Sequence, residues 1–92
     1  MGPNETRKLL EDVIRLSKQF FDCKEHWEEN VDLYATQAMQ IQEQIFKLIL
    51  ALGHTHAELG EELFRILADA PRDWEEKMRK TCSRIEDAQT SI

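Results

Sequence analysis

One apolar stripe, with steps of three or four residues, runs through nearly half of this chain. No Gly or Pro interrupts it. Such spacing is typical of one face of a long helix or of a coiled coil. A helix over this span, at about 1.5 Å per residue, measures roughly 70 Å and cannot belong to a compact monomer. The stripe consists of Leu9, Val13, Leu16, Phe20, Cys23, Trp27, Val31, Tyr34, Ala38, Ile41, Ile45, Leu48 and Leu52.

The composition supports an all-α protein. Only three Gly and two Pro occur, and Gly2 and Pro3 stand at the N-terminus, so the interior has few helix breakers. Charged residues make up 33% of the chain and apolar residues 41%, which suits a soluble helical protein with a narrow core. A chain of 92 residues forms a single small domain, expected over residues 1–92.

Charge and segment composition argue against several classes of function. The net charge of −6 argues against nucleic-acid binding and against simple electrostatic attachment to anionic lipid. No run of about eighteen apolar residues could span a membrane, and no N-terminal segment has the pattern of a secretory signal. Two cysteines are too few for a disulfide framework. We therefore expect an intracellular protein, cytoplasmic or nuclear, without a nucleic-acid partner.

Capping residues predict a long antiparallel helical hairpin. Helix one is expected at about residues 5–52, and a turn follows at residues 53–54 because Gly is typical just after a helix end. Thr55 and Glu58 form a T-x-x-E capping box for helix two, which is expected at about residues 55–88. A turn this short folds the two helices back against each other.

Two irregularities interrupt the hairpin pattern. Between Cys23 and Tyr34 the stripe takes an eleven-residue step, which locally relaxes left-handed supercoiling. Pro71 lies inside helix two, where it removes a backbone donor and crowds the carbonyl group of Leu67. We expect a kink near residue 71, or two helices nearly in line, with Asp69 as the new N-cap.

Antiparallel pairing about the turn predicts the core of the hairpin. Leu48 then faces Leu59, and Tyr34 approaches Trp74. The predicted core consists of Tyr34, Ala38, Ile41, Ile45, Leu48, Leu59, Leu63, Ile66, Ala70 and Trp74.

Helix two ends before it can cover the first part of helix one. A single hairpin would therefore expose an apolar patch there, and such a patch is typical of an interface. We expect a homodimer that forms an elongated four-helix bundle, with a further helical protein as an additional partner. The predicted self-association interface consists of Leu9, Leu10, Val13, Ile14, Leu16, Phe20 and Phe21.

Motifs for catalysis or metal binding are weak in this sequence. It contains no Gly-rich phosphate loop, no H-E-x-x-H motif and no nucleophile elbow. His54 and His56 supply fewer ligands than a metal site needs. Cys23, His26 and Cys82 form a second metal hypothesis, but both cysteines lie on apolar stripes, where buried thiols behave as small hydrophobes. We expect no enzymatic activity, no cofactor and no bound metal.

Two segments at the expected turn resemble a known family. Residues 45–53, with the sequence IFKLILALG, and residues 58–64, with the sequence ELGEELF, resemble the helical hairpin of BAR and inverse-BAR domains over about residues 34–70. The resemblance implies an antiparallel helical dimer that binds and bends membranes through basic surfaces. The residues that match such a surface here are Arg72, Lys77, Arg79, Lys80 and Arg84.

The chain differs from that family in length, in having no third long helix and in its negative charge. We therefore expect a non-catalytic module for self-assembly and protein–protein interaction, a scaffold. BAR-type peripheral membrane binding is the alternative.

Overall fold

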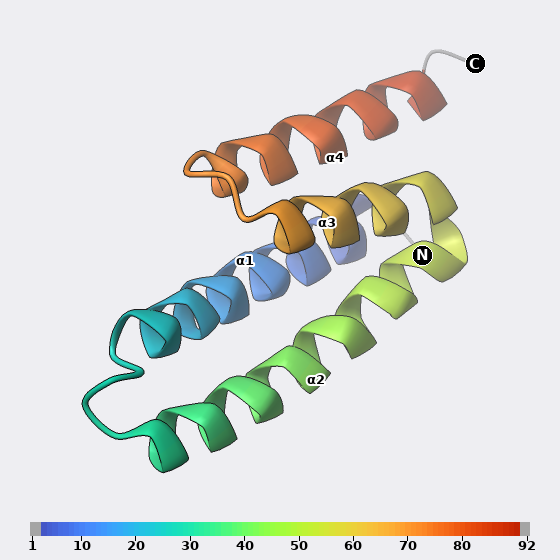
Figure 1. Ribbon diagram of the computed structural model, residues 1–92. Helices are drawn as coiled ribbons and strands as arrows, with labels where there is room; N and C mark the ends of the chain where they lie inside the picture. The colour runs from blue at the N-terminus through green and yellow to red at the C-terminus, as the bar shows by residue number, and fades with distance from the viewer. Residues whose placement is uncertain (1–2, 91–92) are drawn as a thin grey trace.

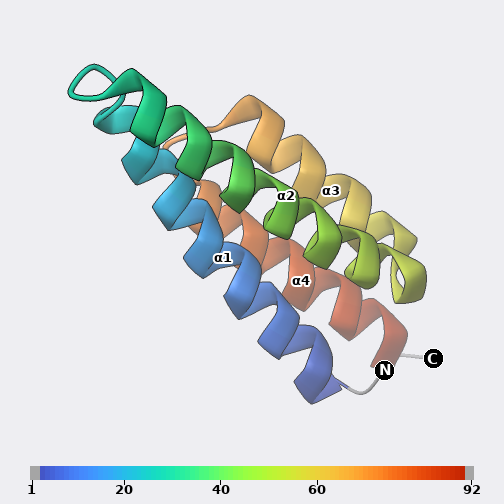
Figure 2. The same cartoon turned by 90° about the horizontal axis from the view of Figure 1, so that it is seen from below.

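The computed structural model describes residues 3–90, and it is all-α over that range. Its helices are α1 (Pro3–Glu25), α2 (Val31–Thr55), α3 (Ala57–Asp69) and α4 (Trp74–Thr90). Each helix runs antiparallel to the one before it, and α4 returns to lie against α1, so the four helices form a closed bundle within one chain (Figures 1 and 2). The bundle measures 51 × 23 × 18 Å.

The expected helix over residues 5–52 is wrong, because the chain reverses direction at residues 26–30. Asn30 is the N-cap of α2, which begins at Val31. Its extended backbone precedes α2, and its side chain accepts a hydrogen bond from the Leu33 backbone amide at 3.1 Å. This bond satisfies one of the amides that have no partner in the first turn of a helix. The longest dimension of the whole bundle, 51 Å, is therefore shorter than the single helix expected from the stripe.

The junction between α2 and α3 lies three residues later than the expected turn. Gly53 is inside α2, and His56 is both the C-cap of α2 and the N-cap of α3. Thr55 is the last residue of α2, so the expected capping box does not form, and α3 has no side-chain cap. The chain folds back at this junction, so α3 runs antiparallel to α2 (Figure 1).

The expected kink at Pro71 is a complete chain reversal. Ala70 takes the left-handed conformation, with φ 47° and ψ 51°, and its amide bonds to the Ile66 carbonyl at 2.9 Å. A residue in this conformation is a common way to end a helix. Pro71 then prevents α3 from continuing, and α4 begins at Trp74 and runs back along the bundle.

The residues expected at a dimer interface lie mainly in the core of the single chain. Val13 and Ile14 are 0% and 2% exposed, and Leu10 and Leu16 are also buried. Because the helices are shorter than expected, α4 folds back over α1 and covers this face with Met78, Cys82 and Ile85. Leu9 and Phe20 are partly buried and pack against the same core, while the Phe21 ring contacts the Trp74 ring in a tilted arrangement, with 5.3 Å between ring centroids. The exposed stripe expected on helix one is therefore absent from α1.

The residues expected in the hairpin core differ in their burial. Tyr34 is partly buried and lies against the His26 ring, whereas its expected partner Trp74 contacts α1. Ala70 is exposed at the end of α3, so it does not face Ala38 across a continuous helix pair. The buried members are Ala38, Ile45, Leu59, Leu63 and Ile66, and those packed against the core while partly buried are Ile41, Leu48 and Trp74.

Candidate functional site

The helices α2 and α3 diverge from their junction (Figure 1). Near the junction the two backbones are close to each other. A Cβ atom added to Gly60 would lie only 3.0 Å from the Gly53 Cα. Farther along, the larger side chains of Phe46 and Phe64 lie between the helices, stacked at 5.4 Å between ring centroids. Two glycines and two phenylalanines thus set the angle at which the helices separate.

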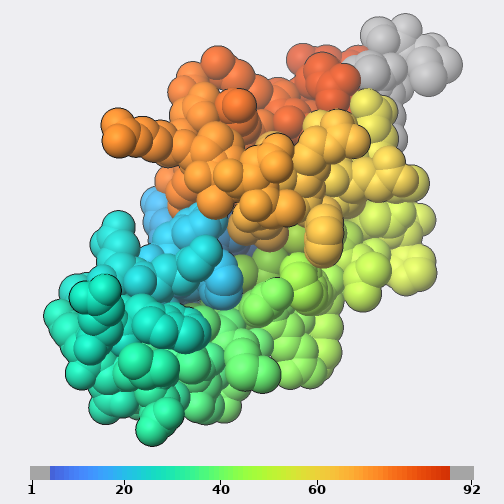
Figure 3. Space-filling view, in the orientation of Figure 1, coloured from blue at the N-terminus to red at the C-terminus, as the bar shows by residue number. Residues whose placement is uncertain are grey.

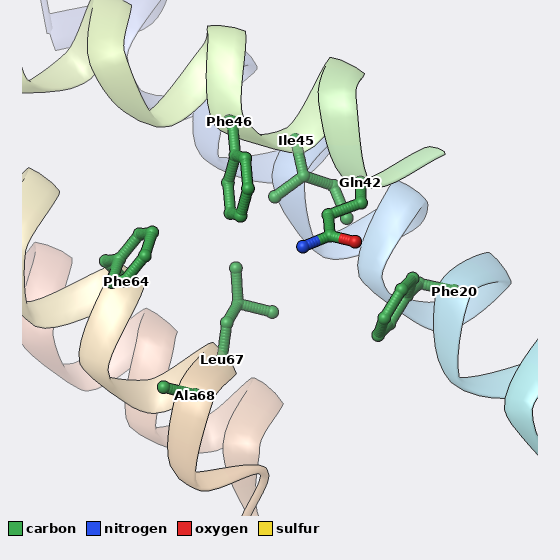
Figure 4. A pocket seen from close by; sticks show the side chains of 7 residues that line it. All are labelled: Phe20, Gln42, Ile45, Phe46, Phe64, Leu67 and Ala68. Atoms are coloured by element: carbon green, nitrogen blue, oxygen red, sulfur yellow. The ribbon is translucent and has the colours of Figure 1, made fainter. Parts of the chain in front are cut away.

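The first hollow lies in the wider part of this seam and has a volume of about 190 Å³. Three helices line it, since Phe20 of α1 closes the space between α2 and α3 (Figure 4). Gln42 supplies its amide group, and every other lining side chain is apolar. The lining residues are Phe20, Gln42, Ile45, Phe46, Phe64, Leu67 and Ala68.

The second hollow lies nearer the junction and has a volume of about 540 Å³. Phe64 lines both hollows, so they adjoin along the seam between α2 and α3, and we call the two together the α2–α3 groove. Small residues at this end leave the second hollow wide and shallow. Its lining residues are Ile49, Leu50, Gly53, His54, Ala57, Gly60, Glu61, Phe64 and Arg65.

The groove exposes large apolar side chains to solvent. Phe64 is 51% exposed and Leu50 is 66% exposed. Met39, 70% exposed, lies on the same face of α2 as Phe46 and Leu50, because residues seven and eleven apart share one side of a helix. In the space-filling view, α2 and α3 meet on the face turned toward the viewer, and the surface is hollowed where atoms of α1 lie between them (Figure 3).

Two charged side chains, Glu61 and Arg65, line the groove. Arg65 is paired within its own helix, 3.2 Å from Glu62. Glu61 lines the second hollow and forms no ion pair with any residue that the structure describes. The unpaired charge at the groove is therefore negative.

The residues of the expected basic patch mostly form ion pairs with neighbouring acids. Lys77 pairs with Asp73 at 3.9 Å, Lys80 with Glu76 at 3.0 Å, and Arg84 with Glu58 of α3 at 3.4 Å. Arg72 forms no ion pair within the described range. The patch is thus largely neutralised by acids on the same surface.

Arg79, the fifth residue of that expected patch, connects α4 to α1. It binds Glu11 of α1 and, at 3.2 Å, Glu75 of its own helix. The hydrogen bond from Arg79 lowers the pKa of Glu11, and the hydrogen bond from Lys18, followed by that from Arg79, lowers the pKa of Glu75. Together with the pair between Arg7 and Glu86 at 3.4 Å, these bonds run along the seam that closes the bundle.

Cys23, His26 and Cys82, which formed the second metal hypothesis, are not placed together to hold a metal ion. The Cys23 thiol contacts Gln37, and the Cys82 thiol contacts Glu86. Burial raises the pKa of Cys82 to about 11, so its thiol is protonated at neutral pH. Among residues 3–90 no group of three or more His, Cys, Asp or Glu side chains is placed to hold a metal ion. His26 instead pairs with Glu29, whose hydrogen bond raises the pKa of His26.

Sequence reasoning missed the groove because Leu50 and Phe64, the exposed large apolar residues of its lining, lie off the predicted apolar stripes. Met39, Phe46 and Leu50 form a second, shorter stripe on α2, and Phe64 lies off the buried face of α3. A second apolar face on an otherwise amphipathic helix was the available signal.

Comparisons with known proteins add no assignment for this site. Searches against models of protein families, curated proteins and solved structures found no match. None of the helices in the described part of the chain is both long enough and apolar enough to cross a membrane.

Proposed function

We propose that this chain is a non-catalytic protein-interaction module whose α2–α3 groove receives an amphipathic helix of another protein. One observation carries the proposal. The bundle already has an extensive apolar core, yet Phe64 and Leu50 remain exposed beside two adjoining hollows. Contiguous apolar surface of this kind is typical of interaction sites, and apolar grooves between helices receive partner helices through their apolar faces.

The dimensions of the groove fit this mode of binding. Along α3 it extends from Ala57 to Ala68, which is about 16 Å at the rise of an α-helix. That length accommodates roughly three helical turns of a partner. A cavity of about 150 Å³ lined by apolar side chains holds a benzene ring, so the first hollow, at about 190 Å³, suits one large apolar side chain.

The expected homodimer remains a prediction, although its expected surface lies in the core. A second copy would have to use another apolar surface, and the α2–α3 groove, where Leu50 and Phe64 are exposed, is such a surface. The BAR-type alternative depends on basic residues, and ion pairs with neighbouring acids occupy four of the five. We therefore favour interaction with a protein helix.

Selection from a library of helical peptides tests the proposal. We expect the enriched peptides to share apolar residues at positions i, i+3 or i+4, and i+7, and to perturb NMR signals of α2 and α3. Phe64→Ser should weaken their binding by about thirtyfold, as expected for an aromatic residue at the centre of an interface.

The matched control is Val31→Ser, which removes an apolar side chain that is 50% exposed at the opposite end of α2. This control should leave the dissociation constant unchanged, and circular dichroism should show the same helix content for both variants. Peptides that bind Phe64→Ser as tightly as the wild type would contradict the proposal, and so would a selection that enriches no binder.

A further inference from the structure

The net charge of the protein is concentrated on the two helices that form the groove. The helices α2 and α3 contain six acidic and two basic residues, a net charge of −4. The helices α1 and α4 contain equal numbers of acidic and basic residues, five of each in α1 and four of each in α4. Two thirds of the total charge of −6 therefore belongs to the α2–α3 pair.

The unpaired charge at the groove itself is also negative. Arg65 lines the second hollow but already has an acidic partner on its own helix, so it contributes little positive field there. Glu61 lines the second hollow and has no cationic partner among the described residues. An occupant of the groove thus meets apolar side chains on the floor and unpaired negative charge at the edge.

This charge distribution distinguishes between the two classes of occupant. A second copy of the chain would bring a second α2–α3 pair of net charge −4 against the first, and like charges across an interface oppose association. A helix with an apolar stripe would pack against the apolar side chains of the groove, and its flanking Lys or Arg side chains would lie beside the unpaired carboxylate at the edge. Opposite charge also raises the rate of encounter at low ionic strength.

We propose that the α2–α3 groove selects a basic amphipathic helix, which places one large apolar side chain in the hollow formed by Phe20, Phe46 and Phe64 and a cation beside Glu61. The inference rests on the proposed function, because it specifies the class of helix that the same groove binds. The partner helix needs about eleven residues in contact to span the groove.

Three synthetic peptides of eighteen residues test the charge preference. All three carry the same Leu and Phe stripe at helical spacing, and their polar faces are all Lys, all Gln or all Glu. Fluorescence anisotropy measures each dissociation constant at about 50 and 200 mM salt. We expect the Lys peptide to bind at least about tenfold more tightly than the Glu peptide at the lower salt, with a difference that shrinks as salt screens the charges.

Variants then locate the effect. Glu61→Gln should weaken binding of the Lys peptide about threefold and leave the Gln peptide unaffected, as expected for one solvent-exposed charge pair. Glu28→Gln is the matched control, since it removes the same charge from the exposed α1–α2 connection at the other end of the bundle. That site is beyond the screening distance at about 0.1 M salt, so the control should bind like the wild type.

The outcomes separate this inference from the proposed function. Equal binding of the three peptides, all weakened by Phe64→Ser, would overturn the basic preference and leave helix docking in place. Light scattering that shows a dimer dissociated by Phe64→Ser would assign the groove to a second copy and also overturn the preference. Absence of binding by all three peptides, with a monomer by light scattering, would overturn both the inference and the proposed function.

Discussion

Ala70 is a single residue that determines where α3 ends. It is the one non-glycine residue with positive φ in the described range, and it is exposed, so no packing requires its methyl group. The left-handed conformation costs an L-residue with a Cβ atom about 1 kcal/mol or more. Glycine takes the same conformation without that cost, but it loses more entropy on folding.

Ala70→Gly should therefore stabilise the protein by about 0.5 to 1 kcal/mol. In a domain of this size the gain corresponds to a rise in melting temperature of roughly 4 °C. Thermal unfolding followed by circular dichroism measures the change. A lower melting temperature for the glycine variant would show that residue 70 does not hold a left-handed cap.

Substitution by alanine should have opposite effects on stability at Gly60 and at Gly53. A methyl group on Gly60 would meet only backbone atoms, with the Gly53 Cα at 3.0 Å, and backbone cannot move aside without separating the helices. Gly60→Ala should lower the free energy of unfolding by about 1 to 2 kcal/mol.

A methyl group on Gly53 meets the Gly60 Cα at an ordinary 4.0 Å. Gly53→Ala should therefore be neutral or stabilising by up to about 1 kcal/mol. Urea unfolding of both variants provides the comparison, and equal destabilisation would contradict the close packing on the Gly60 side.

At the scale of the helices, the sequence predicted helix content and the α2–α3 reversal better than it predicted where α1 ends. Trp27 and Val31 occur at four-residue steps, so the apolar stripe continues in the sequence through residues that are outside any buried face. In the structure these two side chains are 39% and 50% exposed. Periodicity alone cannot distinguish an apolar residue in a core from one in a loop, whereas the cap at Asn30 acts locally and ends the pattern.

The groove depends on tertiary geometry that a pattern of residues does not contain. Phe64 belongs to it because α3 diverges from α2, and Phe20 belongs to it because α1 lies beneath both. The sequence shows that Phe46 and Leu50 lie off the main stripe. It does not show that α3 leaves them uncovered, since that depends on how α3 diverges from α2.

Pro71 distinguishes a reversal from a kinked helix. In a continuous helix, Pro71→Ala would restore a hydrogen bond and raise stability. In the loop between α3 and α4, proline instead restricts the unfolded chain at no cost to the folded one, so Pro71→Ala should lower stability by about 0.4 to 1 kcal/mol. Thermal melting gives the sign of the change. A higher melting temperature would favour a helix that continues through residue 71.

At the scale of the whole molecule, the position of Val13 determines how the chain responds to a charge on α1. If this face of α1 bound a second copy of the chain, Val13→Glu would leave the helix content unchanged and would weaken the assembly. In the bundle, Val13 is fully buried, and an unpaired carboxylate there costs several kcal/mol. This cost is about as large as the free energy of unfolding of a small domain. We expect the variant to lose most of its circular dichroism signal at 25 °C.

Leu33→Glu is the control for that experiment, because Leu33 is 47% exposed on α2. This variant should keep the wild-type spectrum and melting curve. A folded Val13→Glu protein with a smaller mass by light scattering would instead place Val13 at an interface between chains.

The contact between α1 and α4 has a consequence for the order in which the protein acquires its fold during synthesis. Glu11 and Arg79 are 68 positions apart, and Arg7 and Glu86 are 79 apart, so these partners leave the ribosome at different times. Until α4 emerges, Val13 and Ile14 have only α2 and α3 to cover them. The nascent chain therefore carries an incomplete core until α4 has emerged, and in this interval chaperones have an opportunity to bind it.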